Sequence, residues 1–311
     1  MIKKTLYFGN PVYLSLQHNQ LFIKLPEVEN NAALPDKFKQ DSRRSIPVED
    51  IGVVILDHQQ ITLTQPVLSA LLGNNAAVIT CDTQHMPVGL HLPLYGNTIQ
   101  QERFKYQIDA SLPLKKQLWQ QTIRQKIYNQ AAVLSLEHGV VVKNMLRWAE
   151  DVKSGDPDNL EGRAAVYYWK NLFPDVIGFT RDREGISPNH MLNYGYAILR
   201  AIMARSLVGS GLLPTLGIHH HNRYNAFCLA DDIMEPYRPY VDRVILEIIK
   251  EQGVVNELTK DIKKKLLSIP VLDVIINGRR SPLLIAAGLT TSSLAACYTG
   301  EQRRIAYPEI K

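Results

Sequence analysis

The chain has 311 residues, 45% of them hydrophobic and 21% charged, which is enough for a large core and two domains. It has no run of 18 apolar residues, and this excludes a membrane-spanning helix. Cys81, Cys228 and Cys297 are odd in number and far apart, so we expect reduced thiols and a cytoplasmic location. Of the net charge of +5, residues 1–97 contribute −1 and residues 98–311 contribute +6, with 28 Lys and Arg against 22 Asp and Glu. A basic surface of this kind is about equally consistent with a phosphate-containing partner and with ordinary solvated surface charges.

The first part of the chain is predicted to be mainly β structure. Short apolar runs between turn residues predict strands over 4–8, 13–17, 20–25, 48–56, 61–63 and 76–81. A short helix is expected over 67–72, and the polar, proline-punctuated residues 26–45 predict a loop. Pro93 and Gly96 mark a linker. We therefore expect a small, β-sandwich-like domain over residues 1–95.

After this linker the apolar period changes to 3.6 residues, which is typical of helices. Helices are predicted over 115–150, 157–172, 193–209, 241–249 and 257–267. The β-rich and helical parts are segregated along the chain, an α+β arrangement. The second domain, residues 96–311, is predicted to be larger and all-α.

The densest group of metal-type ligands lies between Gly217 and Pro236. It consists of three consecutive histidines and three later carboxylates: His219, His220, His221, Asp231, Asp232 and Glu235. Neutral imidazole together with carboxylate oxygens suits a hard or borderline divalent cation, and the lack of thiolates argues against structural zinc. A cation held in this way acts on phosphates or water. The alternative is a polar loop followed by a solvated acidic helix end.

A second candidate is Glu161, which shares a helix face with Ala164 and Tyr168. A carboxylate in such an apolar setting needs a cation to stay charged. The alternative is a first-turn glutamate that complements the helix dipole.

Basic residues near the histidine segment could contact phosphate. Arg223 and Arg238 are the best candidates, although either could instead be an ordinary salt-bridge partner. The chain has no glycine-rich nucleotide loop, no paired CxxC and no serine elbow.

In combination, these motifs resemble the CRISPR-associated integrase family, the first of the CRISPR adaptation proteins. The resemblance rests on Glu161–Ala165, on Gly217 with His220 three residues later, and on Asp232–Pro239. The order of these motifs and the β-then-α layout agree, so the resemblance covers nearly the whole chain. The compact segment 222–227 is most similar to the type II branch.

The resemblance implies that Glu161, His220 and Glu235 are the catalytic residues and the ligands of Mg²⁺ or Mn²⁺. The two histidines adjacent to His220 are competing choices. Many members carry aspartate where this chain has Glu235, so Asp232, one turn earlier, is a further ligand or a group that supports one.

The resemblance also implies a reaction and partners. A homodimer with contacts through the β domain would join a small ferredoxin-like second CRISPR adaptation protein on double-stranded DNA, and the type II effector nuclease would be a further partner. The helical domain would insert a short DNA duplex into the repeat array when a 3′ hydroxyl attacks a phosphodiester. The alternatives are a stand-alone metal-dependent DNA nuclease and a non-catalytic DNA-binding scaffold.

Overall fold

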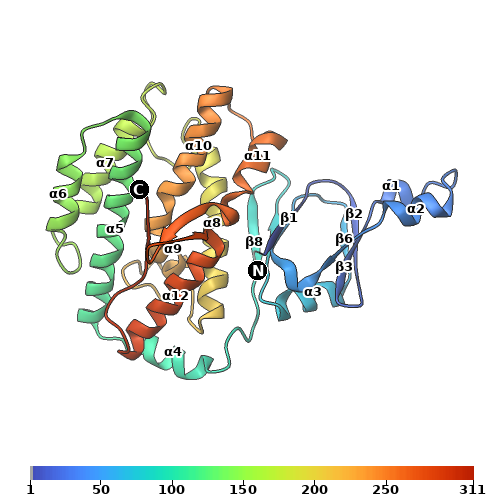
Figure 1. The fold of residues 1–311 in the computed structure, drawn as a ribbon, viewed down its shortest axis with the longest axis horizontal. Helices are drawn as coiled ribbons and strands as arrows, with labels where there is room; N and C mark the ends of the chain where they lie inside the picture. The colour runs from blue at the N-terminus through green and yellow to red at the C-terminus, as the bar shows by residue number, and fades with distance from the viewer. Residues whose placement is uncertain (1–2) are drawn as a thin grey trace. The chain divides into compact units, whose positions relative to one another are not determined.

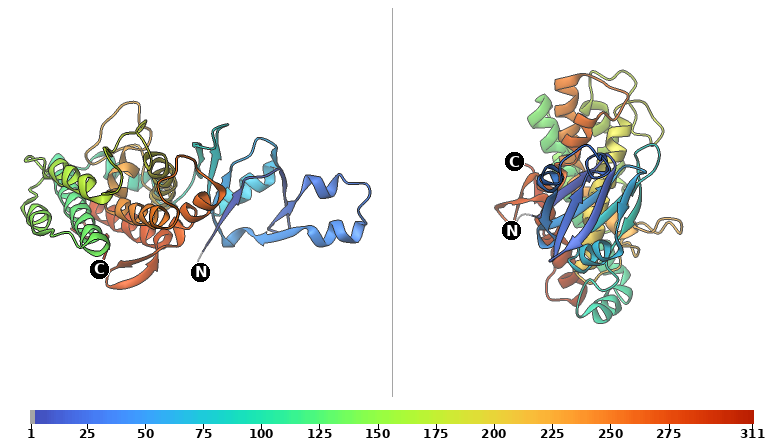
Figure 2. Two further views of the ribbon diagram at one scale, coloured as in Figure 1. Left: turned by 90° about the horizontal axis from the view of Figure 1, so that it is seen from above. Right: turned by 90° about the vertical axis from the view of Figure 1, so that its right-hand side faces the viewer.

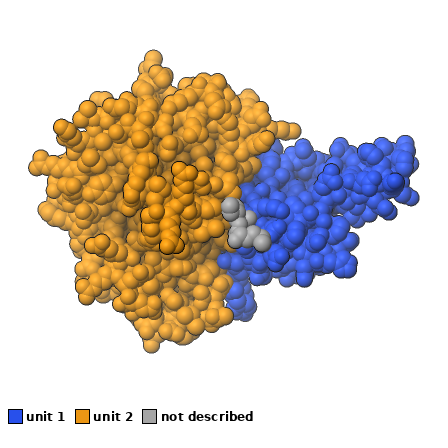
Figure 3. Space-filling model, viewed as in Figure 1, with its two compact units in different colours: residues 1–95 blue, residues 96–311 orange. Residues whose placement is uncertain are grey.

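The computed structural model describes residues 3–311, drawn in Figure 1 and from two further directions in Figure 2. The chain divides into two compact units, residues 1–95 and residues 96–311 (Figure 3). Strands dominate the first unit and helices the second, as expected for an α+β protein. Within residues 3–311, no helix is both long and apolar enough to cross a membrane.

The first unit holds two sheets and a helix that covers them. The strands and this helix are β1 (Lys4–Phe8), β2 (Val12–Gln17), β3 (Gln20–Lys24), β4 (Arg44–Pro47), β5 (Ile51–Leu56), β6 (Ile61–Leu63), α3 (Gln65–Gly73), β7 (Ala77–Cys81) and β8 (Pro87–His91). One sheet has the order β1-β5-β7-β8, with only β8 antiparallel to its neighbour. The other has the order β4-β3-β2-β6, in which β2 and β6 are parallel.

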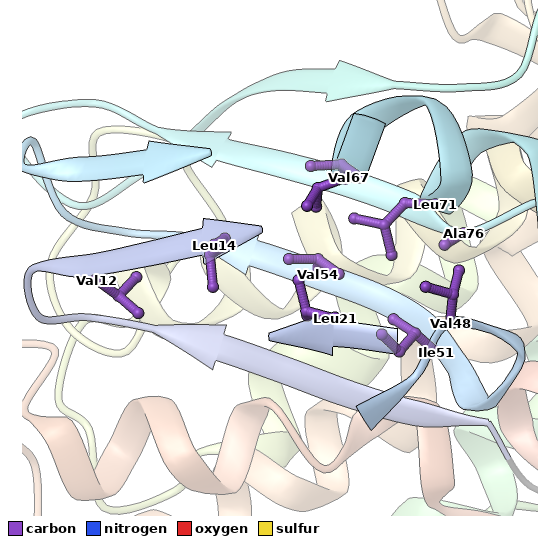
Figure 4. Packing of buried hydrophobic residues seen from close by; sticks show 10 residues of the cluster. Val12, Leu14, Leu21, Val48, Ile51, Val54, Val67, Leu71 and Ala76 are labelled. Carbon is purple, nitrogen blue, oxygen red and sulfur yellow. The ribbon is translucent and has the colours of Figure 1, made fainter. Parts of the chain in front are cut away.

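An apolar core joins the two sheets and α3 (Figure 4). On β2, Val12 and Leu14 are buried and Tyr13 between them is exposed, the alternation of a strand with one buried face. Helix α3 adds Val67 and Leu71 to the same cluster. Burial of each such side chain contributes roughly 1.5–3 kcal/mol, so the unit has a core of its own.

Two parts of this unit differ from the prediction. The expected loop over 26–45 contains α1 (Pro26–Glu29) and α2 (Asp36–Ser42), which extend beyond the strands (Figure 1). Neither helix has a buried residue, so the sequence shows no apolar period there. Strand β8 was also missed, because it contains Pro87 and Gly89 and none of its residues is fully buried.

The second unit is built mainly from helices. They are α4 (Gln100–Ile108), α5 (Leu112–His138), α6 (Lys143–Asp151), α7 (Leu160–Leu172), α8 (Asn189–Gly209), α9 (Cys228–Met234), α10 (Arg238–Gln252), α11 (Lys260–Leu266) and α12 (Leu283–Thr299). Helix α5 packs against α6, α7 and α10 (Figure 1). The single helix predicted over 115–150 is in fact two, because Gly139 ends α5 with a left-handed φ of 61°.

The second unit is the larger, helical one that was predicted, but it is not all-α. A small antiparallel sheet, with β9 (Asp273–Ile276) between β10 (Arg279–Pro282) and β11 (Pro308–Glu309), lies beside the C-terminus (Figure 2). These strands are two to four residues long and two of them contain proline, so no run of alternating residues marks them in the sequence.

Candidate metal centre

Three charged side chains from separate parts of the second unit meet beside α5. The Lys126 ammonium lies 2.6 Å from Glu161 Oε1 at the start of α7. It also lies 2.6 Å from Glu235 Oε2 in the 3-10 turn η2 (Glu235–Tyr237). Lys126 and Glu235 are buried, and Glu161 is half-buried. The fold thus brings together two of the carboxylates that the sequence suggested as ligands.

Glu161 is held in place by the way α7 begins. Asn159, in a left-handed conformation with φ 48°, accepts a hydrogen bond from Gly162 N at 3.1 Å. The Asp156 carboxylate accepts from Leu160 N and Glu161 N, each at 2.9 Å. These bonds satisfy the free N–H groups of the first turn, so Glu161 projects from an ordered helix start.

His220 lies on the loop before α9 and is oriented by a buried carboxylate. Asp232 is fully buried and accepts hydrogen bonds from His219 N at 2.9 Å and His220 N at 3.3 Å. It also bonds His220 Nδ1, which leaves Nε2 for another partner. This hydrogen bond raises the pKa of His220, and burial offsets only part of the increase. Glycine is needed at Gly217, because a Cβ there would overlap the His220 carbonyl oxygen.

The other two histidines have different surroundings. His219 stacks face to face on Trp119 with the ring centres 4.1 Å apart, and burial lowers its pKa. His221 is exposed on the loop. Of the three, His220 has a carboxylate on Nδ1 and shares electrostatic interactions with Glu161 and Glu235.

Arg238 completes a balanced cluster of four charges. Its Nε lies 3.0 Å from Glu235 Oε1, and its guanidinium stands 4.7 Å from the centre of the Tyr196 ring. Burial would raise the pKa of Glu235, but the Arg238 and Lys126 cations lower it overall. Arg238 therefore holds a carboxylate of the site in addition to any contact it makes with phosphate.

Arg223 has a different setting from Arg238. It lies on the exposed loop before α9, with its guanidinium 4.6 Å from the centre of the Tyr224 ring. Among residues 3–311, no carboxylate forms an ion pair with Arg223, so this arginine remains a candidate for phosphate contact.

Sequence reasoning missed Lys126 and Asp242. Lys126 lies on the buried side of α5 with Ile123 and Ile127, and a lysine at such a position is a signal, since it needs a partner to stay charged. Asp242, buried on α10, accepts hydrogen bonds from Tyr168 at 2.8 Å and from Tyr196 at 2.6 Å.

The donor set fits a divalent cation on one condition. Two carboxylates already converge on one cationic atom, and a histidine whose Nδ1 bonds a carboxylate is set to ligate through Nε2. As the side chains of residues 3–311 stand, however, no three His, Cys, Asp or Glu groups enclose an ion. The ammonium of Lys126 occupies the position between the carboxylates. Mg²⁺ or Mn²⁺ therefore fits these ligands if that ammonium withdraws.

Comparisons with known proteins identify the family of this chain. The model of a family described as "CRISPR associated protein Cas1" matches residues 7–269. The CRISPR-associated endonuclease Cas1 of Neisseria meningitidis serogroup C (strain 8013) is 36% identical over 312 residues, which span 100% of this chain and 97% of that protein.

Solved structures with lower identity confirm the fold. A casposase bound to integration product has a TM-score of 0.75 at 20% identity, over 98% of this chain and 92% of that one. A chain of a Cas6-RT-Cas1--Cas2 complex has a TM-score of 0.69 at 19% identity, over 97% of this chain and 35% of that one. The chain therefore belongs to the Cas1 family of CRISPR-associated endonucleases, the integrases of spacer acquisition.

Proposed function

We propose that this chain inserts short DNA duplexes into a CRISPR repeat array, with Glu161, His220 and Glu235 as the ligands of Mg²⁺ or Mn²⁺. A 3′ hydroxyl of the incoming duplex attacks a phosphodiester at the repeat border, and the 3′ oxygen of the array leaves. The observation that carries the proposal is the convergence of Glu161 and Glu235 on one cation. The Glu161 carboxylate from α7 and the Glu235 carboxylate from η2 each lie 2.6 Å from the same ammonium, and without a cation between them they would repel one another.

The roles of the side chains follow from their contacts. A divalent cation held by these residues would stabilise the negative charge that develops on the phosphate oxygens and would polarise the attacking hydroxyl. Asp232 holds His220 through Nδ1, and Arg238 holds Glu235 through Oε1. A ligating imidazole is neutral, so His220 acts as a ligand and not as the general base. The remaining task of the protein is to keep the two DNA ends in line for attack.

We infer that the chain acts as a homodimer, with residues 1–95 providing the dimer contacts. We infer double-stranded DNA and a second CRISPR adaptation protein as its partners. The similar solved chains support the two partners, since one is a casposase bound to integration product and the other belongs to a Cas6-RT-Cas1--Cas2 complex. The positive charge of residues 98–311 suits DNA, and we assign Arg223 to a phosphate contact. The three scattered cysteines suit the cytoplasm.

A strand-joining assay tests the proposal. The purified protein, with and without the second adaptation protein, is mixed with a labelled duplex and a supercoiled plasmid that bears a repeat. Mn²⁺, Mg²⁺ or a chelator is then added. Glu161→Gln removes one ligand charge with little change of shape, and Glu150→Gln makes the same change on the exposed side of α6.

We expect joined product with either metal and none with the chelator. Glu161→Gln should lose joining but keep its DNA affinity in a gel-shift assay, whereas Glu150→Gln should match the wild type. Cleavage without joining in every mixture would favour a stand-alone nuclease. Undiminished joining by Glu161→Gln would contradict the proposed site and favour a structural role for this residue.

A further inference from the structure

The buried lysine in the metal centre has no place in the roles assigned so far. Lys126 contacts Glu161 and Glu235 at equal distances of 2.6 Å, and its side chain is only 11% exposed. It reaches these carboxylates from α5, whereas they belong to α7 and η2. A single ammonium thus links three separate segments of the second unit.

The ion pairs around this lysine show what its removal would cost. Glu161 and Glu235 each lie 2.6 Å from the Lys126 ammonium, and Arg238 Nε lies 3.0 Å from Glu235 Oε1. With Lys126 removed, the two carboxylates would share the positive charge of Arg238. A buried excess of negative charge is costly.

We propose that the Lys126 ammonium is an internal cation that substitutes for the divalent metal: it holds Glu161 and Glu235 in place when no metal is bound, and it leaves them when metal binds. This inference rests on the proposed metal site and specifies how that site is kept in order before loading. A lysine suits the task because its ammonium is a compact charge on a flexible four-carbon stem. The ion pairs of Lys126 with Glu161 and Glu235 stabilise the metal-free protein. Because they must break when metal binds, they also lower the affinity for metal.

Those two effects are linked by thermodynamics. If the ammonium and the metal exclude each other, the stability that Lys126 gives the metal-free protein must reappear as weaker metal binding. If Lys126 instead remained beside the metal as a fixed ion pair, its removal would destabilise the protein equally with and without metal. Stability measured in both states therefore separates the two cases without any reference to catalysis.

The experiment compares four full-length proteins: the wild type, Lys126→Met, Lys126→Met combined with Glu161→Gln, and Lys116→Met. Methionine keeps the straight chain of lysine but lacks the charge. Lys116 lies on the exposed side of α5 and serves as the matched control. Mn²⁺ affinity is measured by calorimetric titration, and thermal unfolding is followed with Mn²⁺ and with a chelator.

We expect Lys126→Met to unfold roughly 6 °C or more below the wild type in chelator, and to recover most of this loss in saturating Mn²⁺. Its Mn²⁺ affinity should rise by about tenfold or more. The double variant has lost one carboxylate charge, so its melting temperature should recover in chelator. The control should match the wild type in both measurements. If Lys126→Met folds only with Mn²⁺, that also supports the proposal.

Two results overturn the inference, and they differ. If the wild type binds Mn²⁺ and Lys126→Met binds it no more tightly, or loses the same stability in Mn²⁺ as in chelator, the exchange is wrong while the metal site stands. If the wild type binds no Mn²⁺ with Glu161-dependent affinity, the proposed metal site fails and the exchange fails with it.

Discussion

The buried carboxylate of Asp242 makes stability depend on pH in an unusual direction. Asp242 is 1% exposed, and burial raises its pKa from 3.8 to about 6, even though Tyr196 and Tyr168 donate hydrogen bonds to it. The folded protein therefore holds this proton more tightly than the unfolded chain does. The contribution of Asp242 to the free energy of unfolding should fall as pH rises from 3.8 to about 6 and then level off. At 1.36 kcal/mol per pKa unit the loss is roughly 3 kcal/mol.

Asp242→Asn removes the titrating group and keeps its size. The difference in free energy of unfolding between this variant and the wild type should shift by roughly 2 kcal/mol in favour of the variant between pH 4 and pH 7, because the unfolded chain has already lost part of its proton at pH 4. Urea unfolding followed by tryptophan fluorescence suits the test, since Trp119, Trp148 and Trp169 all lie in residues 96–311. The signal thus reports the unit that contains Asp242.

Asp261→Asn makes the same change on the exposed side of α11 and serves as the matched control. If the difference between Asp242→Asn and the wild type stayed constant from pH 4 to pH 7, the pKa of Asp242 would be ordinary. Burial would then not outweigh the two hydrogen bonds that Tyr168 and Tyr196 donate to Asp242.

Three further substitutions test the supports of the site. Asp232→Asn should weaken Mn²⁺ binding about 10- to 100-fold in a calorimetric titration, because the carboxylate orients His220; unchanged affinity would rule out that support. Gly217→Ala should lower strand joining with DNA affinity retained, since its Cβ would push the His220 backbone away; full joining would contradict the close packing seen here. Asn129→Ala should lower the free energy of unfolding by about 2–4 kcal/mol in a urea titration, because Asn129 bonds the backbone of Pro236, Pro308 and Ile310; a loss below that range would show that water replaces these bonds.

The sequence was most informative where residues of one site are close along the chain. The family and its class of activity were predicted correctly from the Glu161 and Gly217–Pro236 segments. Strands of the first unit with one apolar face were located to within a few residues, because their alternation is a local signal.

What the sequence could not reveal depends on contacts between distant segments. Lys126 precedes Glu161 by 35 positions, and nothing near it in the chain shows that two carboxylates lie beside it. Asp242 appears as an ordinary polar residue of an amphipathic helix until α7 and α8 bring Tyr168 and Tyr196 to it. The choice of His220 among three adjacent histidines likewise became clearer only when Asp232 was seen to bond its ring.

The most direct test of the proposed centre is the position of the metal itself. Crystals of the full-length protein, grown with Mn²⁺ and measured at a wavelength where manganese scatters anomalously, would locate it. We expect a peak bound by the carboxylates of Glu161 and Glu235 and by Nε2 of His220, with the Lys126 ammonium withdrawn. A manganese peak bound by other residues, or none at an Mn²⁺ concentration that supports strand joining, would contradict the assignment of this site.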